Sequence, residues 1–138
     1  MTIKETYDYL LQIRRLDGKI RLAIQQYEAL KSQLLPSGIR SDLDKIQTTP
    51  EDRFSELEAI TIDLEKNIKE LRQQKQKAIV EVTRTIYRLK DDEAETVLLM
   101  YYVGRKPIED IADAMNYSVR SVYYIKRRAI HSIAQMTK

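Results

Sequence analysis

Two long stretches of the chain repeat their apolar residues at helical spacing. The first covers about residues 2–34. Its apolar side chains recur at alternating steps of three and four residues, at Ile13, Leu16, Ile20, Ala23, Tyr27, Leu30 and Leu34. This spacing places them on one stripe of a helix. Pro36 and Gly38 then predict the end of that helix, because proline cannot continue a helix and glycine suits its exit.

The second stretch covers about residues 50–88 and follows a linker at 35–49. Thr49 suits an N-cap and Pro50 suits the first helical position. The stripe contains Leu57, Ile60, Leu64, Ile68, Leu71, Ile79, Val82 and Ile86, with Lys75 as its one polar interruption. Two helices with one apolar stripe each must bury those stripes against something. We therefore predict that residues 1–88 form an antiparallel, coiled-coil-like hairpin or arm; pairing between two chains is the alternative.

The pattern changes at Asp91. Three consecutive acids at 91–93 suit a helix start, and the run that follows is apolar enough to form a core. We expect a break in helical structure at residues 104–107 and a short helix at residues 108–115. Ser118 is a natural N-cap for a last helix at about 119–134.

The last two helices fit the steric requirements of a helix-turn-helix. Ala112 supplies the small residue where the helices cross, and Asn116 tolerates the positive φ of the turn. Apolar residues occupy the remaining core offsets, at Ile108, Ile111, Met115, Tyr117, Val122 and Ile125. The predicted fold class is therefore all-α, with a helical hairpin domain at 1–88 and a helix-turn-helix domain at 89–138.

A helical wheel separates two faces of the last helix. Val122, Ile125, Ala129 and Ile133 share the inward face. The opposite face has Arg120, Tyr124, Arg127 and His131, with Tyr123 and Arg128 beside them. Guanidinium groups can pair with phosphates or guanine edges, and phenol hydroxyls can reach phosphates. This face therefore predicts binding of duplex DNA in the major groove.

The candidate DNA-binding residues divide by their expected contacts. Near the base edges we expect Ser118, Arg120, Ser121 and Tyr124, because the start of a recognition helix usually meets the bases. On the DNA backbone we expect Tyr123, Arg127 and Arg128, with Arg105 and Lys106 as further phosphate contacts and His131 as a phosphate contact or an inert exposed residue. Lys126 lies at the rim of the core, where it would snorkel or meet an acid such as Asp113.

Composition narrows the class of protein. The 138 residues are 43% hydrophobic and 33% charged, enough for a core but too charged for a membrane protein. The net charge is only +3, yet after Ser118 the chain has five basic residues and no acidic one. Without cysteine, and without a phosphate-binding glycine loop or a nucleophile–base pair, we expect no catalytic site, metal or cofactor. An N-terminus without an apolar leader favours the cytoplasm.

The C-terminal third resembles region four of bacterial sigma factors. The residues that carry the likeness are Leu98–Gly104, Ile108–Ala112 and Ser118–Tyr123, and the resemblance covers roughly residues 89–133. Asn116 departs from it, because that turn usually has glycine. With its long helical N-terminal part, the chain also looks like phage and prophage regulators of late genes, of the ArpU and RinA type. The resemblance implies DNA binding and contact with RNA polymerase.

Together these features predict a sequence-specific transcriptional regulator that binds double-stranded DNA through the helix at 119–134. Two alternatives remain open. One is a phage DNA-packaging recognition subunit, and the other is a helical adaptor that docks on RNA polymerase without binding DNA alone. The expected partners are duplex DNA, RNA polymerase and, through the N-terminal helices, a second copy of the chain. No membrane is expected.

Overall fold

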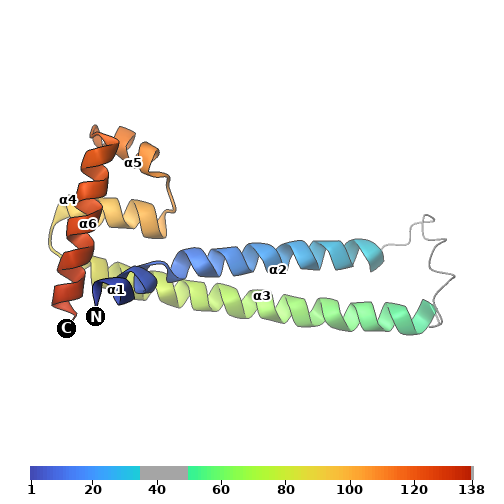
Figure 1. The fold of residues 1–138 in the computed structure, drawn as a ribbon. Helices are drawn as coiled ribbons and strands as arrows, with labels where there is room; N and C mark the ends of the chain where they lie inside the picture. The colour runs from blue at the N-terminus through green and yellow to red at the C-terminus, as the bar shows by residue number, and fades with distance from the viewer. Residues whose placement is uncertain (35–49, 138) are drawn as a thin grey trace. The chain divides into compact units, whose positions relative to one another are not determined.

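A computed structural model describes residues 1–34 and 50–137, and all the regular structure in this part of the chain is helical. In chain order the elements are α1 (Ile3–Leu10), α2 (Gln12–Leu34), α3 (Pro50–Tyr87), α4 (Asp92–Leu98), the π-helix η2 (Leu99–Val103), α5 (Ile108–Met115) and α6 (Val119–Met136), as Figure 1 shows. This confirms the predicted all-α class. The predicted linker at 35–49 and the Thr49 cap lie outside the described residues. Within those residues, no helix has the length and apolar character needed to cross a membrane.

Contacts between residues divide the chain into two compact units. One, the hairpin unit, is Gly18–Gln73. The other, the terminal unit, combines Met1–Asp17 with Gln74–Lys138. This division differs from the predicted boundary between residues 88 and 89. The reason is packing, because apolar residues of α1, the start of α2 and the end of α3 share a core with α4 and α6.

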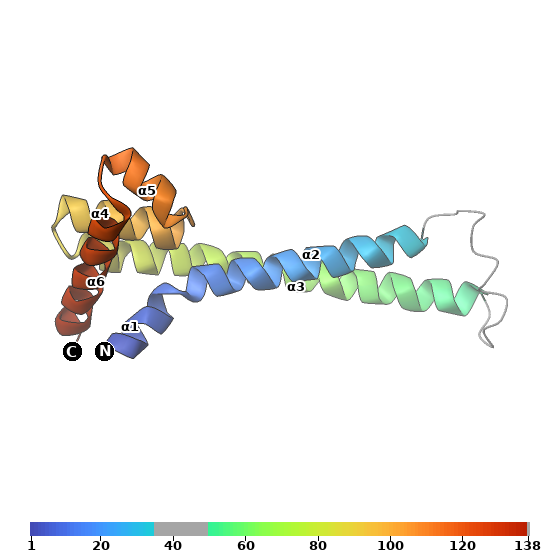
Figure 2. The same ribbon diagram turned by 45° about the horizontal axis from the view of Figure 1, so that its top comes forward.

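In the hairpin unit, α2 and α3 lie side by side and run antiparallel, as both views show (Figure 2). Ile20 and Ala23 on α2 are buried, as are Ile68 and Leu71 on α3. The Tyr27 hydroxyl also donates a hydrogen bond to the Glu65 carboxylate, at 2.8 Å. The predicted intrachain hairpin is confirmed for this unit.

One position on the predicted stripe of α3 differs. Ile60 was expected to face inward, but 47% of it is exposed, and the neighbouring Thr61 is buried in its place. The Thr61 hydroxyl satisfies its hydrogen-bonding need locally by donating to the Leu57 carbonyl at 2.8 Å. A hydroxyl bonded to its own helix can occupy an inward position at little cost.

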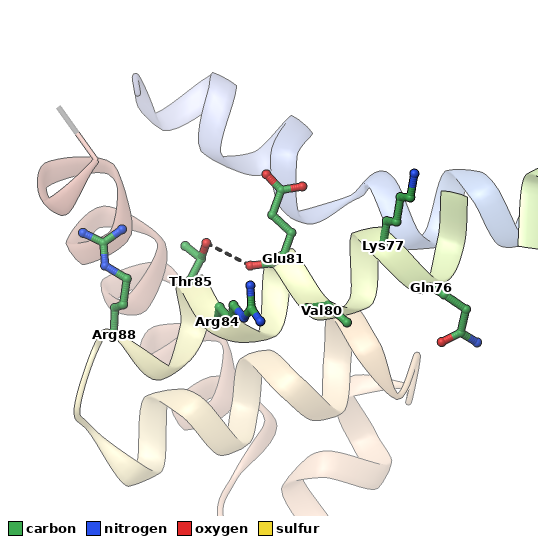
Figure 3. A pocket seen from close by; sticks show the side chains of 7 residues that line it. All are labelled: Gln76, Lys77, Val80, Glu81, Arg84, Thr85 and Arg88. Carbon is green, nitrogen blue, oxygen red and sulfur yellow. Dashed lines mark hydrogen bonds between the residues drawn. The ribbon is translucent and has the colours of Figure 1, made fainter. Parts of the chain in front are cut away.

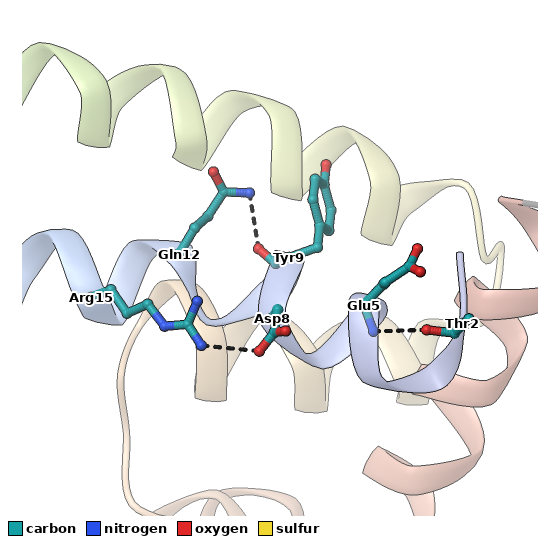
Figure 4. A network of polar contacts seen from close by, with 6 residues as sticks. All are labelled: Thr2, Glu5, Asp8, Tyr9, Gln12 and Arg15. Carbon is teal, nitrogen blue, oxygen red and sulfur yellow. Dashed lines mark hydrogen bonds and ion pairs between the residues drawn. The ribbon is translucent and has the colours of Figure 1, made fainter.

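The predicted first helix is two helices, with a break at Leu11. The Gln12 side-chain amide donates to the Tyr9 carbonyl at 2.9 Å, and an Arg15–Asp8 ion pair bridges the break at 3.0 Å (Figure 4). With the break between them, Leu10 and Ile13 are both fully buried. Three-and-four spacing continues across the break, and for that reason the sequence pattern did not reveal it.

The terminal unit has two apolar clusters. The larger one joins α1, α2, α3, α4, η2 and α6, and its buried members are Leu10, Ile13, Ala78, Val82, Ile86, Ala94, Leu98, Tyr102, Ala129, Ile130 and Ile133. The smaller one holds α4, α5 and α6 together through Val97, Ile108, Ile111, Ala112 and Val122. α4 and α6 contribute to both clusters, so they fix the position of the helix-turn-helix within the unit.

The π-helix η2 makes the transition from α4 to the helix-turn-helix. Its wider turn ends where the Gly104 amide donates to the Leu99 carbonyl at 2.8 Å, five residues back. A Cβ on Gly104 would lie 3.0 Å from the Met100 carbonyl oxygen, so a larger residue would crowd the backbone here. The predicted break at 104–107 is confirmed.

Candidate nucleic-acid interface

The helix-turn-helix has the predicted turn and cap, but Tyr117, expected in its core, is 41% exposed. Asn116 ends α5 in the left-handed conformation, with φ 58° and ψ 40°. The Tyr117 amide donates back to the Ala112 carbonyl at 2.9 Å, and Ala112 itself is buried. The Ser118 hydroxyl caps α6 by accepting from the Ser121 amide at 3.1 Å. Asparagine therefore replaces glycine at the turn without loss of the required conformation.

The inward face of α6 is wider than predicted. Val122, Ala129 and Ile133 are buried as expected, and Ile125 is half-buried. Ile130 is also fully buried, which the wheel missed. α6 packs on α1, α4 and α5, so apolar partners surround more of its circumference than a single neighbour would cover.

The opposite face of α6 is open to solvent. The exposed residues are Ser118, Arg120, Ser121, Tyr123, Tyr124, Arg127, Arg128 and His131. We call the row Arg120, Tyr124, Arg127 and His131 the α6 face. Neither Arg120 nor Arg127 forms an ion pair with any acid in residues 1–34 and 50–137. Both guanidinium groups therefore keep their hydrogen-bond donors available for an external anion.

Two of the exposed side chains have partners on α6 itself. The Ser118 hydroxyl, which caps the helix, also donates to the Ser121 hydroxyl at 2.9 Å. The Arg128 guanidinium lies 5.6 Å from the centre of the Tyr124 ring, within cation–π range. These contacts order the first turns of the helix before any ligand binds.

Arg105 has a partner that the sequence did not indicate. Its Nε lies 2.7 Å from Oδ2 of Asp17, and Lys75 Nζ lies 2.6 Å from the other oxygen of that carboxylate. Asp17 is buried, so its charge needs both cations. Arg105 was predicted to contact phosphate, but here its guanidinium stabilises the chain's own carboxylate. Arg105 and Lys106 are both exposed, and of the two only Arg105 pairs with an acid among the described residues.

The signal for this cluster was present in the two apolar stripes. Lys75 interrupts the stripe of α3, and Asp17 lies beside the stripe of α2. Opposite charges interrupting two apolar stripes are a pattern that favours pairing when the stripes meet. Arg105 gave no such signal, because it reaches Asp17 from a loop 88 positions further along the chain, where its φ is 53°.

Lys126 is half-buried among aromatic rings and pairs with neither Asp113 nor any other acid in residues 1–34 and 50–137. Its ammonium lies 4.3 Å from the ring centre of Tyr101 and within 5.7 Å of those of Tyr102 and Tyr7. Burial lowers the pKa of Lys126, and repulsion from Arg14 lowers it further. The expected rim position is confirmed, but the stabilising partners are π faces. Tyr101 and Tyr102 both pack in the larger apolar cluster, and Tyr102 is almost fully buried.

Two of the cavities on the terminal unit are wide open to solvent. One, of about 400 Å³, lies between α4 and α6 and is lined by Glu93, Tyr117, Arg120, Ser121, Tyr124 and Ile125. The other, of about 510 Å³, runs along the outer side of α3 (Figure 3) and is lined by Gln76, Lys77, Val80, Glu81, Arg84, Thr85 and Arg88. The first includes three of the predicted DNA-contacting residues. Glu93, the acid in that cavity, was not among the predicted site residues.

Comparison with known proteins places the chain in a family. Residues 42–134 match the family described as proteins of unknown function, DUF1492, and the chain belongs to this family. No curated protein and no solved structure matches the chain. The family description names no activity, so functional conclusions depend on the site itself.

Proposed function

We propose that this protein is a sequence-specific transcriptional regulator that binds duplex DNA with α6 in the major groove. The observation that carries the proposal is the α6 face, on the exposed side of the second helix of a helix-turn-helix. It presents a tyrosine and two guanidinium groups that form no ion pair within residues 1–34 and 50–137. Arg120 and His131 are eleven residues apart, so the row is about 16 Å long. An α-helix of that kind fits the major groove, which is about 12 Å wide.

The contacts follow from position along α6. Arg120 and Ser121 lie in its first turn, where a recognition helix meets base edges. Arg127 lies two turns later and suits the phosphate backbone. The hydrogen-bonded cap and the Arg128–Tyr124 cation–π contact reduce the conformational entropy that binding would otherwise cost. The resemblance to region four of sigma factors and to phage late-gene regulators supports a role in transcription.

The test is binding to a random-sequence duplex across a salt titration. Phosphate-driven association weakens steeply with salt, with a slope of about 0.9 per phosphate contact. We expect Arg127→Ala to lower that slope by about 1 and weaken binding to all sequences alike. Arg120→Ala should cost about 1–3 kcal/mol on a duplex selected for tight binding, as loss of a base contact does.

Arg72→Ala is the matched control, because it removes an exposed arginine from α3 in the hairpin unit. It should bind as the parent does. If the parent fails to bind duplex even at low salt, the proposal is wrong, and a helical adaptor for RNA polymerase becomes the better reading. If the parent binds and both α6 variants bind equally well, DNA contacts another surface.

A further inference from the structure

Glu93 occupies an unexpected place for an acid, beside the start of α6. It lies in the first turn of α4, is exposed, and shares the 400 Å³ cavity with Arg120, Ser121 and Tyr124. Its Oε2 accepts a hydrogen bond from the Tyr117 hydroxyl. Tyr117 belongs to the turn of the helix-turn-helix, so this bond ties the carboxylate to the element that sets the start of α6.

The neighbouring acids differ from Glu93 in what they contact. The Asp91 side chain accepts from the Ala94 amide as the cap of α4. Asp92 is exposed on the same turn but does not line the cavity. Glu93 alone among these three acids both lines the cavity and is held by a side chain of the helix-turn-helix.

The Tyr117 hydroxyl is protonated near neutral pH and can donate to Glu93. Glu93 raises the pKa of Tyr117, first through the hydrogen bond and then through its charge. The phenol therefore keeps its proton and continues to donate. The hydrogen bond holds the Glu93 carboxylate as an acceptor in the cavity where the first turn of α6 would meet DNA.

A carboxylate at this place has two opposite effects on the binding of DNA. It repels phosphate, which every sequence presents alike. It can also accept a hydrogen bond from a base amino group, such as cytosine N4, which only some sequences present at a given position. A carboxylate that repels phosphate and accepts a hydrogen bond from a base amino group therefore increases the difference in affinity between DNA sequences.

We propose that Glu93, held by Tyr117, is a specificity-determining residue of the α6 interface: it weakens phosphate binding at the start of α6 and favours sites that offer a base amino group there. This inference rests on the proposed DNA-binding function. It adds α4, which is outside the helix-turn-helix, to the surface that reads DNA.

The test variant is Glu93→Gln, because its amide oxygen can still accept from Tyr117 while the charge is removed. On a random-sequence duplex we expect it to bind several-fold more tightly than the parent. On a duplex selected by the parent from a random pool, the gain should be absent or reversed, so the ratio of selected to random affinity falls. Asp92→Asn removes the same charge one residue away and should leave that ratio near the parent value.

Tyr117→Phe removes the hydrogen bond that holds Glu93 and leaves the carboxylate itself unchanged. It should lower the selected-to-random ratio with helix content and thermal midpoint close to those of the parent. Failure of the parent to bind any duplex at low salt would overturn the proposed function itself. If the parent binds but Glu93→Gln and Asp92→Asn change the ratio equally, only the role of Glu93 is overturned, because general charge then explains the effect.

Discussion

The hairpin unit and the terminal unit bury their apolar residues to different depths. In the terminal unit, Leu10, Ile13, Val82 and Ile86 from the first three helices have no exposed surface. The same holds in α4, α5 and α6 for Val97, Leu98, Ile111, Val122, Ile130 and Ile133. In the described part of the hairpin unit, the buried apolar residues keep 4–9% of their surface exposed. The same unit leaves large apolar side chains open to solvent, namely Leu22, Phe54, Ile60 and Ile62.

The difference follows from the number of packed elements. Two helices meet along one seam, and every seam residue has water on its flanks. A third and fourth element close those flanks, as α4 and α6 do over α1 and α3 in the terminal unit. Stability within one chain is therefore uneven, and the element proposed to bind DNA is anchored in the unit with the deeper core.

The largest expected effect comes from truncating a core residue of the terminal unit. Ile133→Ala removes a side chain with no exposed surface, and we expect a loss of about 2–5 kcal/mol in the free energy of unfolding. Ile68→Ala in the hairpin unit should lower the free energy of unfolding by about 2 kcal/mol or less. The reason is that neighbouring side chains or water can fill the space that the truncated side chain leaves. Urea unfolding followed by circular dichroism measures both. Equal losses would contradict the difference between the units.

The next largest effect on stability is expected from the polar side-chain contacts within each unit. Asp17→Asn leaves Lys75 and Arg105 without their shared carboxylate, and we expect about 1–3 kcal/mol of destabilisation, since both cations remain partly hydrated. Tyr27→Phe removes the exposed hydrogen bond to Glu65 in the hairpin unit and should cost less than about 1 kcal/mol. Thermal melts of the two variants would decide the order, and a reversed order would show that Asp17 contributes little.

A smaller effect depends on pH and on Lys126. Burial lowers its pKa below the ordinary 10.5, so the folded state binds this proton less tightly than the unfolded state. The cost of burying the charged ammonium lowers the free energy of unfolding at every pH below the folded-state pKa of Lys126. This cost disappears as the pH rises toward 10.5, so the folded state becomes more stable over that rise. Relative to Lys126→Met, the parent should therefore gain stability as the pH rises to 10.5.

Matched urea titrations of the parent and Lys126→Met across that range measure the difference, which cancels the titration of the other groups. We expect a change below about 1 kcal/mol, because contacts with the Tyr101 ring offset part of the cost of burial. A constant difference across the range would show that Lys126 is as well solvated folded as unfolded.

The smallest effect is expected at the surface of the hairpin unit. Leu22 is 57% exposed on α2, so Leu22→Ser should change the free energy of unfolding by less than about 0.5 kcal/mol. Ile20→Ser, two residues earlier and buried, is the control that should destabilise clearly. If Leu22→Ser destabilises as much, or changes the sedimentation of the protein, this side of α2 contacts another chain.

Local patterns in the sequence determined most of the elements. The spacing of apolar residues predicted α3, α5 and the start of α6, because a helical period depends only on neighbouring positions. The cap at Ser118 and the left-handed Asn116 also follow from the chemistry of single residues. For the same reason the exposure of Arg120 and Arg127 could be predicted, since a helix with one apolar stripe presents its other side to water.

Only the tertiary structure decided which segments pack together. Residues 1–17 join the terminal unit, and Arg105 meets Asp17 across 88 positions of the chain. Lys126 lies on tyrosine rings contributed by α1 and η2, and Glu93 of α4 reaches the turn before α6. Such contacts depend on how several helices pack at once, and no periodicity within one helix records which neighbour covers it or which distant charge it meets.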